Sequence, residues 1–186
     1  MADPKKFSPL QRVLHWLMAI CILTMFFVGV GMVSTVTPKY LRLIELHKTV
    51  GILLLILVVI RIAARWRYGA PALPANLPVP IKLAAGLSHY VLYGLMIVMP
   101  LLGWSMLSAA NYPVVVFGGL RLPPIAPQGE LLHTVLWDAH HYLAFVFFAV
   151  VLAHLSAALM HALIRRDGVF EAMSPLPGPS MRQPGG

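Results

Sequence analysis

The fold is decided by residues 136–164, which read LWDAHHYLAFVFFAVVLAHLSAALMHALI. After Asp138 this stretch carries no charged side chain. It is also longer than the roughly 20 residues that an apolar helix needs to cross the ~30 Å hydrocarbon core of a membrane. Three further stretches have the same character, at about 10–35, 43–65 and 84–109. The sequence therefore predicts four transmembrane helices.

The composition of the 186 residues agrees with a membrane protein. Hydrophobic residues make up 59% and charged residues 11%, which is not the composition of a soluble domain. The formal charge of +8 would suggest nucleic acid in a soluble chain, but here the basic residues flank membrane segments, and we expect no nucleic-acid partner. Cys21 is the only cysteine, so the chain builds neither an intrachain disulfide nor a cysteine-ligated cluster. We expect an all-α integral membrane four-helix bundle.

The chain divides into a short N-terminal segment (1–9), a single four-helix domain (10–168) and a tail (169–186). The apolar run at 13–36 is too long for a usual signal-peptide core, so we expect it to be retained as the first span. Residues 70–80 contain four prolines and are predicted to be a non-helical connection. Residues 111–132 are predicted to be a loop over one mouth of the bundle. The tail is rich in Pro, Gly and Ser, and we expect it to be disordered.

The basic residues predict the orientation of the four spans in the membrane. With four spans, both ends of the chain lie on one side. That side carries Lys5, Lys6, Arg12, Arg61, Arg65, Arg67, Lys82, Arg165, Arg166 and Arg182. The other side carries Lys39, Arg42, Lys48 and Arg121. Because cytoplasmic loops are richer in Lys and Arg, we expect both termini in the cytoplasm, with the bundle embedded in membrane lipid. For a bacterial source, this membrane is the inner membrane.

Histidines are the chemically informative residues, because ionisable groups at membrane depth are costly and usually face a bundle interior, a cofactor or a pathway. His140 and His154 are fourteen residues apart on one predicted helix. In an α-helix this spacing leaves them ~40° apart on one face and ~21 Å apart along the axis. One helix therefore offers two ligands at two depths. Depth then selects the partners, His47 for His140 and His15 for His154.

Two histidine pairs at two depths indicate two stacked haems. Bis-histidine ligation fills both axial positions of a haem iron and suits electron transfer. Zinc fits less well, because its protein sites need three or four clustered ligands. Hydrogen bonding between helices and proton relay are the simpler alternatives for any single histidine. His140 is preferred to His141, which points ~140° from the face of His154, but His141 and His89 both stay open as substitute ligands.

Several segments carry a resemblance to a known family: residues 14–16, 46–52, 57–65, 86–90 and 140–161. Together they resemble the bacterial cytochrome b561 family, which is related to the cytochrome b subunits of nickel-iron hydrogenases and formate dehydrogenases. The resemblance covers residues 8–166. It implies two haem b groups, with axial ligands at His15, His47, His140 and His154.

One branch of this family consists of superoxide:ubiquinone oxidoreductases, so the resemblance implies superoxide at the periplasmic face and ubiquinone in the membrane. His161 matches a quinone-binding position of that branch, and it lies ~10 Å along the helix from His154 and ~20° off its face. Lys82 is the nearest counterpart of the branch's quinone-binding lysine, in a different register. Among the outer basic residues, Lys48 and Arg121 are the predicted catalytic residues that steer superoxide.

Two other functions stay open. The chain is alternatively an electron-transfer subunit for a periplasmic dehydrogenase or hydrogenase, which would co-purify with a large partner. A third alternative is a non-redox haem-binding or structural bundle, in which the histidines serve packing or proton relay. A colourless purified protein would favour a purely structural bundle.

Overall fold

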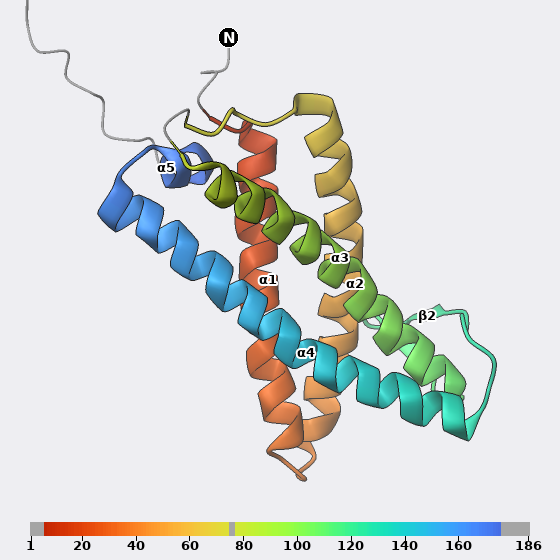
Figure 1. Cartoon of the computed structure of the whole chain (residues 1–186). Coiled ribbons are helices and arrows are strands. Elements are labelled where there is room, and N and C mark those ends of the chain that lie inside the picture. The colour runs from red at the N-terminus through yellow and green to blue at the C-terminus, as the bar shows by residue number, and fades with distance from the viewer. Residues whose placement is uncertain (1–5, 75–76, 176–186) are drawn as a thin grey trace, which may run out of the picture.

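The computed structural model describes residues 6–74 and 77–175. In this part of the chain four long helices follow one another: α1 (Pro9–Val33), α2 (Lys39–Tyr68), α3 (Val79–Ala109) and α4 (Glu130–Leu159) (Figure 1). A π-helix, η1 (Met160–Arg165), extends α4, and a short helix, α5 (Val169–Met173), follows. All four long helices are long and apolar enough to cross a membrane. The predicted all-α membrane bundle is confirmed.

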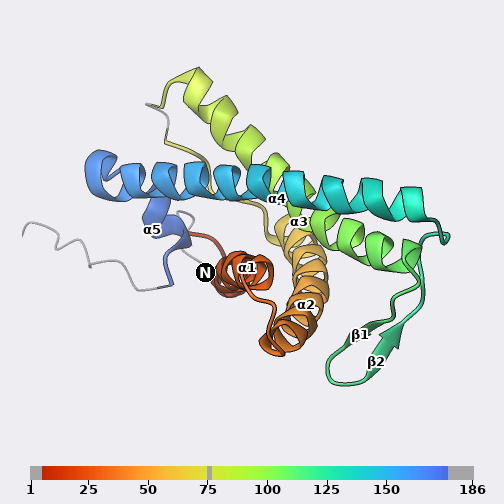
Figure 2. The same cartoon turned by 90° about the horizontal axis from the view of Figure 1, so that it is seen from below.

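The helices pack as two hairpins. α1 packs against α2 and α3 against α4, while α2 joins the two hairpins through α3. Figure 1 shows α3 and α4 inclined to α1 and α2, and Figure 2 shows the first turns of α3 diverging from the end of α4. One end of the bundle carries α5 and is called the α5 end. The other carries a β-hairpin and is called the hairpin end.

Local signals fix where the helices begin and end. Ser8 caps α1, since its hydroxyl accepts from the backbone N–H of Gln11 at 3.3 Å while its own N–H donates to the Gln11 side chain at 3.1 Å. Gly69, in the left-handed region at φ 67°, follows the last residue of α2. The prediction that residues 70–80 are entirely non-helical is wrong at its end, because α3 begins at Val79. Pro80 is tolerated there, since the first turn of a helix needs no N–H donor.

The expected loop at 111–132 contains regular structure. Strands β1 (Val114–Val116) and β2 (Leu120–Leu122) pair antiparallel, with Val115 opposite Arg121. The turn between them places Phe117 at φ 49° and Gly118 at φ 76°, which is the backbone that tight hairpin turns need. β1 packs against α2 with Val114 and Val116 buried, so the hairpin is fixed to the bundle.

The start of the expected disordered tail is helical in the structure. Three hydrogen bonds tie α5 and the residue after it to α1 and the residues before it: Phe7 N–H to the Ala172 carbonyl at 3.1 Å, Trp16 Nε1 to Met173 O at 2.9 Å, and Arg12 Nη1 to Ser174 O at 3.1 Å. These contacts give residues 169–174 partners that composition alone does not reveal. Residues 176–186 of the tail lie outside the described residues, as do Lys5 and Arg182.

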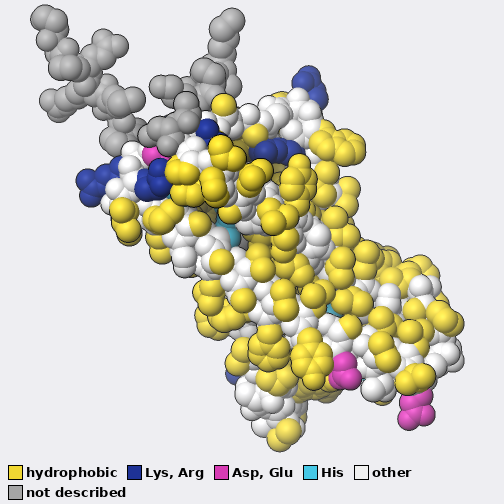
Figure 3. All heavy atoms as spheres, in the orientation of Figure 1, with side chains coloured by type: hydrophobic (Ala, Val, Ile, Leu, Met, Phe, Trp, Pro, Cys, Tyr) yellow, Lys and Arg dark blue, Asp and Glu magenta, His cyan; other side chains and the backbone are white. Residues whose placement is uncertain are grey.

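Much of the surface of the bundle is apolar. The core lies where α1, α2, α3 and α4 meet, around residues such as Met18, Val58, Met96 and Phe147. Large apolar side chains such as Phe27 and Phe145 are exposed along the helices. Figure 3 shows these hydrophobic flanks, with Lys and Arg side chains gathered mainly near the α5 end. Such a surface fits lipid, which solvates apolar side chains that water would not.

Candidate functional site

The four predicted ligand histidines meet in two pairs. At the α5 end, the ring of His15 on α1 faces that of His154 on α4, with 6.2 Å between ring centroids and 87° between planes. At the hairpin end, His47 on α2 faces His140 on α4, with 6.1 Å between centroids and 66° between planes. These are the partners that helix depth predicts. α4 contributes one member to each pair.

The spacing within each pair is that of two imidazoles on either side of one metal ion. A metal–imidazole bond is about 2 Å long and the ring centre lies roughly 1 Å beyond the nitrogen, so opposed ligands have ring centres roughly 6 Å apart. Among the described residues, the Nδ1 atoms of His47 and His140 are buried and have no hydrogen-bond partner. The ring spacing of both pairs therefore fits a haem.

A glycine on α3 makes room for one of these rings. A Cβ atom on Gly103 would lie 3.2 Å from Cε1 and 3.6 Å from Nδ1 of His140. The shorter distance is tighter than an ordinary contact. The lack of a side chain at Gly103 therefore leaves the space that the ring of the predicted ligand His140 occupies.

A third histidine stands at the α5 end. The ring of His89 on α3 lies 5.5 Å from that of His154, at 80° between planes. Its Nδ1 donates to the carbonyl of Ala85 at 2.6 Å, a bond that metal-ligating histidines commonly make with the nitrogen that does not bind the metal. His89 therefore stays open as an alternative ligand opposite His154.

The remaining two histidines of α4 make other contacts. His141 Nδ1 donates to the carbonyl of Trp137 at 3.0 Å, and the two rings lie 4.6 Å apart. His133 Nδ1 donates to the carbonyl of Met106 at 3.0 Å, which ties the start of α4 to the end of α3. Among the described residues, both rings contact Trp137, and neither is paired with another histidine ring.

Comparison with known proteins identifies the family. A family model described as prokaryotic cytochrome b561 matches residues 6–175. The chain belongs to the prokaryotic cytochrome b561 family. It is 31% identical to cytochrome b561 homolog 2 of Escherichia coli K12, over 91% of the chain and 92% of that protein. It is 27% identical to cytochrome b561 homolog 1 of the same organism, over 91% and 97%, and 29% identical to the probable superoxide oxidase CybB of Yersinia pestis, over 92% and 97%.

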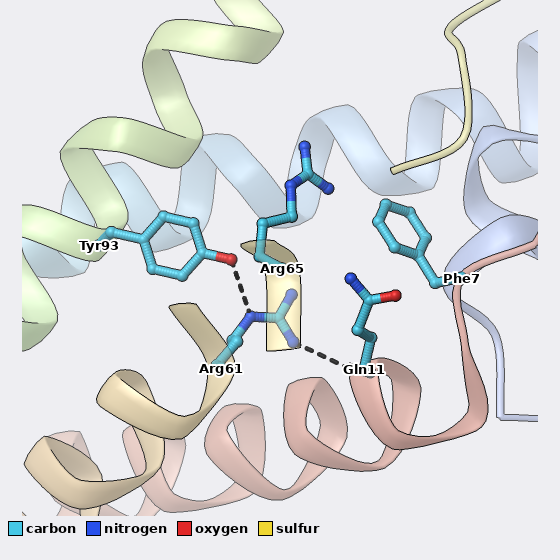
Figure 4. Close-up of a pocket in the computed structure, with 5 residues that line it drawn as sticks. All are labelled: Phe7, Gln11, Arg61, Arg65 and Tyr93. Atoms are coloured by element: carbon cyan, nitrogen blue, oxygen red, sulfur yellow. Dashed lines mark hydrogen bonds between the residues drawn. The ribbon is translucent and has the colours of Figure 1, made fainter. Parts of the chain in front are cut away.

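This cytochrome b561 chain carries two arginines beside its α5-end histidines. Arg61 Nε donates to the hydroxyl of Tyr93 at 3.2 Å, and its Nη1 donates to the carbonyl of Gln11 at 3.0 Å (Figure 4). These residues line a small cavity together with Phe7 and Arg65. The charge of Arg61 acts electrostatically on His15, His89 and His154. From the sequence, Arg61 could be placed only on the side of the membrane that carries the termini, because its contacts come from two other helices, α1 and α3.

The predicted quinone residue His161 is buried on η1, with 8% of its surface exposed. Its Nδ1 lies 2.7 Å from Oδ2 of Asp167, a residue that sequence reasoning missed. Burial alone would raise the pKa of the Asp167 carboxyl, but hydrogen bonds from His161, the Val169 N–H and Arg165 outweigh it and hold that pKa below its ordinary value. Lys82 lies in the first turns of α3, which diverge from the end of α4 (Figure 2), and its quinone contact stays a prediction.

The predicted superoxide residues both belong to the hairpin end. Lys48 follows His47 on α2 and is half-buried, whereas Arg121 is exposed on β2. Packing of β1 against α2 places the hairpin beside the helix that carries Lys48. Arg121 also borders a shallow cavity together with Asn111 and Tyr112. The roles of both side chains stay predictions.

Proposed function

We propose that this chain is a dihaem membrane oxidoreductase that oxidises superoxide at the hairpin end and reduces ubiquinone at the α5 end. The observation that carries the proposal is the meeting of four histidines in two pairs, with ring centroids 6.1 and 6.2 Å apart, at opposite ends of one bundle. His47 with His140, and His15 with His154, would hold the two haems. When bound, each b haem supplies an iron that takes up or gives up one electron.

Arg61 and Arg65 fit the carboxylate side chains that a b haem carries. Guanidinium groups bind carboxylates with paired, charge-assisted hydrogen bonds. Arg61 is held in place by Tyr93 and Gln11, so its charge stays near His15 and His154. We propose that these two arginines anchor the haem at the α5 end.

Positive charge at the hairpin end supports an anionic substrate. Lys48 adjoins His47, and Arg121 lies on the hairpin that packs against the same helix. Positive side chains around an entry point raise the local concentration of a small anion. The similarity to a protein called a probable superoxide oxidase supports superoxide as that anion. Lys39 and Arg42 add to the same field.

The α5 end supports quinone reduction. His161 is fixed through Nδ1, which leaves Nε2 for a quinone carbonyl, and Lys82 is the proposed second contact. Two superoxide anions lose one electron each and leave as dioxygen, while one ubiquinone takes up two electrons and two protons and becomes ubiquinol. With the α5 end in the cytoplasm of a bacterium, as the basic residues favour, both protons come from the cytoplasmic side.

The test separates the two half-reactions. Detergent-purified protein is mixed with superoxide in a stopped-flow spectrometer and the reduced form is then mixed with ubiquinone-1. Rapid reduction by superoxide followed by rapid reoxidation by the quinone supports the proposal. A haem protein that superoxide does not reduce would favour the alternative of an electron-transfer subunit for a periplasmic dehydrogenase or hydrogenase. A purified protein without haem would favour the alternative of a structural bundle.

A further inference from the structure

Asp167 stands behind the proposed quinone ligand His161, and its role rests on the ubiquinone reduction proposed above. We infer that Asp167 is a positioning residue for proton delivery. Its carboxylate accepts the Nδ1–H of His161, so that Nε2 is the nitrogen that gives a proton to the quinone oxygen. The pair then takes up the next proton from water at the α5 end.

The contact between the two side chains is short and enclosed. Nδ1 of His161 lies 2.7 Å from Oδ2 and 3.0 Å from Oδ1 of Asp167, and the two side chains are only 10% and 12% exposed. Two further donors hold the carboxylate in place: Arg165 Nε at 3.3 Å from Oδ2, and the Val169 N–H at 3.3 Å from Oδ1. The carboxylate is therefore oriented from three sides toward the ring.

The backbone departs from a regular helix where it brings these residues together. Asp167 follows His161 by six residues. In a regular α-helix it would lie about 240° around the axis from His161 and would face away from it. Instead the chain passes through the π-helix η1, and Arg166 turns it back at φ 48° with its N–H on the His161 carbonyl at 2.8 Å. Left-handed backbone is uncommon at a residue other than glycine, and π turns occur frequently at functional sites. Both features serve the same contact.

Arg165, with Nε 3.3 Å from Oδ2, favours an ionised Asp167 carboxylate. η1 packs against α4 and α5. Besides Arg165, which contacts Asp167, the titratable and charged groups on the nearby turns are His154 on α4, Arg166 after η1 and Glu171 on α5. With an anion on Nδ1–H, the imidazole keeps that proton fixed and exchanges its other one, as in carboxylate–histidine pairs of acid–base catalysts.

The proton balance is simple. As the quinone oxygen gains electrons that superoxide supplies, the N–H bond at Nε2 of His161 breaks and an O–H bond forms on the quinone. The Nδ1–H bond of His161 stays intact, and it continues to donate to the carboxylate of Asp167. His161 is left neutral and regains a proton from water, and a second such transfer completes ubiquinol.

The test compares Asp167→Asn, Asp167→Glu and a matched control, Glu171→Gln, which removes a carboxylate from the same end without touching His161. Reoxidation of the pre-reduced protein by ubiquinone-1 is followed as a function of quinone concentration. We expect Asp167→Asn to lower the limiting rate about tenfold or more, with little change in the KM for quinone, because proton transfer by a positioned side chain contributes about 100-fold or more. Reduction by superoxide and haem content should be unchanged in that variant. Asp167→Glu should recover part of the rate, and Glu171→Gln should keep the wild-type rate.

A second readout is independent of turnover. In ¹⁵N-histidine-labelled protein, the Nδ1–H resonance that disappears in His161→Gln should move in Asp167→Asn and stay in place in Glu171→Gln. Wild-type reoxidation rates in Asp167→Asn, or equal slowing in Glu171→Gln, would overturn the inference while leaving the proposed function intact. A wild-type protein that ubiquinone fails to reoxidise would overturn the proposed function and the inference together.

Discussion

Replacing Gly103 by alanine tests whether the ring of His140 is held in a ligand position. The added Cβ would lie 3.2 Å from Cε1 of His140, which is 0.2 Å inside the 3.4 Å at which ordinary contact begins. The ring of His140 therefore has to shift. Such a shift changes its 6.1 Å centroid distance from the ring of His47, which is the spacing that a haem between the two rings would need. The shift therefore acts on the haem site proposed at the hairpin end.

The size of the effect follows from the cost of overpacking. Inserting a methyl group into a well-packed site costs about 1–3 kcal/mol. If that cost falls on the bound state, haem retention at this site weakens by about 5- to 150-fold. Gly94 provides the matched control, because it lies on the same helix and a Cβ there meets no atom within 4 Å. Gly94→Ala changes helix propensity equally, so the difference between the variants reports the contact with His140.

The assay is haem per chain after detergent purification, together with the low-spin EPR signals. Gly103→Ala should lose the hairpin-end haem in preference and retain the other, whereas Gly94→Ala should keep both. If Gly103→Ala keeps two haems with unchanged EPR signals, the placement of His140 as a ligand beside Gly103 is refuted.

Four further outcomes follow from the same structure. His47→Ala or His140→Ala should remove one haem and leave the other in the visible spectrum, and loss of both or of neither would contradict the pairing. Because the pKa of Asp167 is held below its ordinary 3.8, the carboxylate stabilises the fold above that pH and this contribution fades as pH falls through the lowered value. The Tm difference between wild type and Asp167→Asn should therefore shrink in acid, and a difference that is constant with pH would count against it. Arg61→Gln should lower the potential of the α5-end haem by up to about 60 mV, the one-electron equivalent of 1.4 kcal/mol, because a nearby cation favours the reduced form; an unchanged redox titration would contradict this. Lys48→Gln should slow the reaction with superoxide and reduce its dependence on salt in stopped-flow measurements, whereas an unchanged salt dependence would remove Lys48 from the entry path.

The spans, and the depth of each histidine in its span, were predictable because each depends on one helix at a time. Length and hydropathy reveal a membrane helix, and the 3.6-residue period places His140 and His154 on one face of α4. The same reasoning orders His15 and His47 by depth, and the structure brings each beside the partner of equal depth. The 3.6-residue period predicts which face a residue lies on only as far as the helix stays regular.

What the sequence did not reveal depends on irregular backbone or on contacts between helices. Asp167 reaches His161 only through a π turn and a left-handed Arg166, and regular periodicity places it on the wrong face. The strands of the hairpin at 114–122 are too short to show an alternating pattern. α5 is held by hydrogen bonds to its own backbone carbonyls, and a backbone contact leaves no trace in the amino-acid composition. The proximity of His89 to His154 depends on how α3 crosses α4, which no single-helix argument fixes.

In the proposed function, His15 with His154 and His47 with His140 hold two haems at opposite ends of the bundle. The most direct measurement of this is the haem b content per chain of purified wild type and of His15→Ala, by pyridine haemochrome absorbance against amino-acid analysis. We expect two haems per chain in the wild type and one in the variant, with the hairpin-end signal retained. One haem in the wild type, or two in the variant, would contradict it.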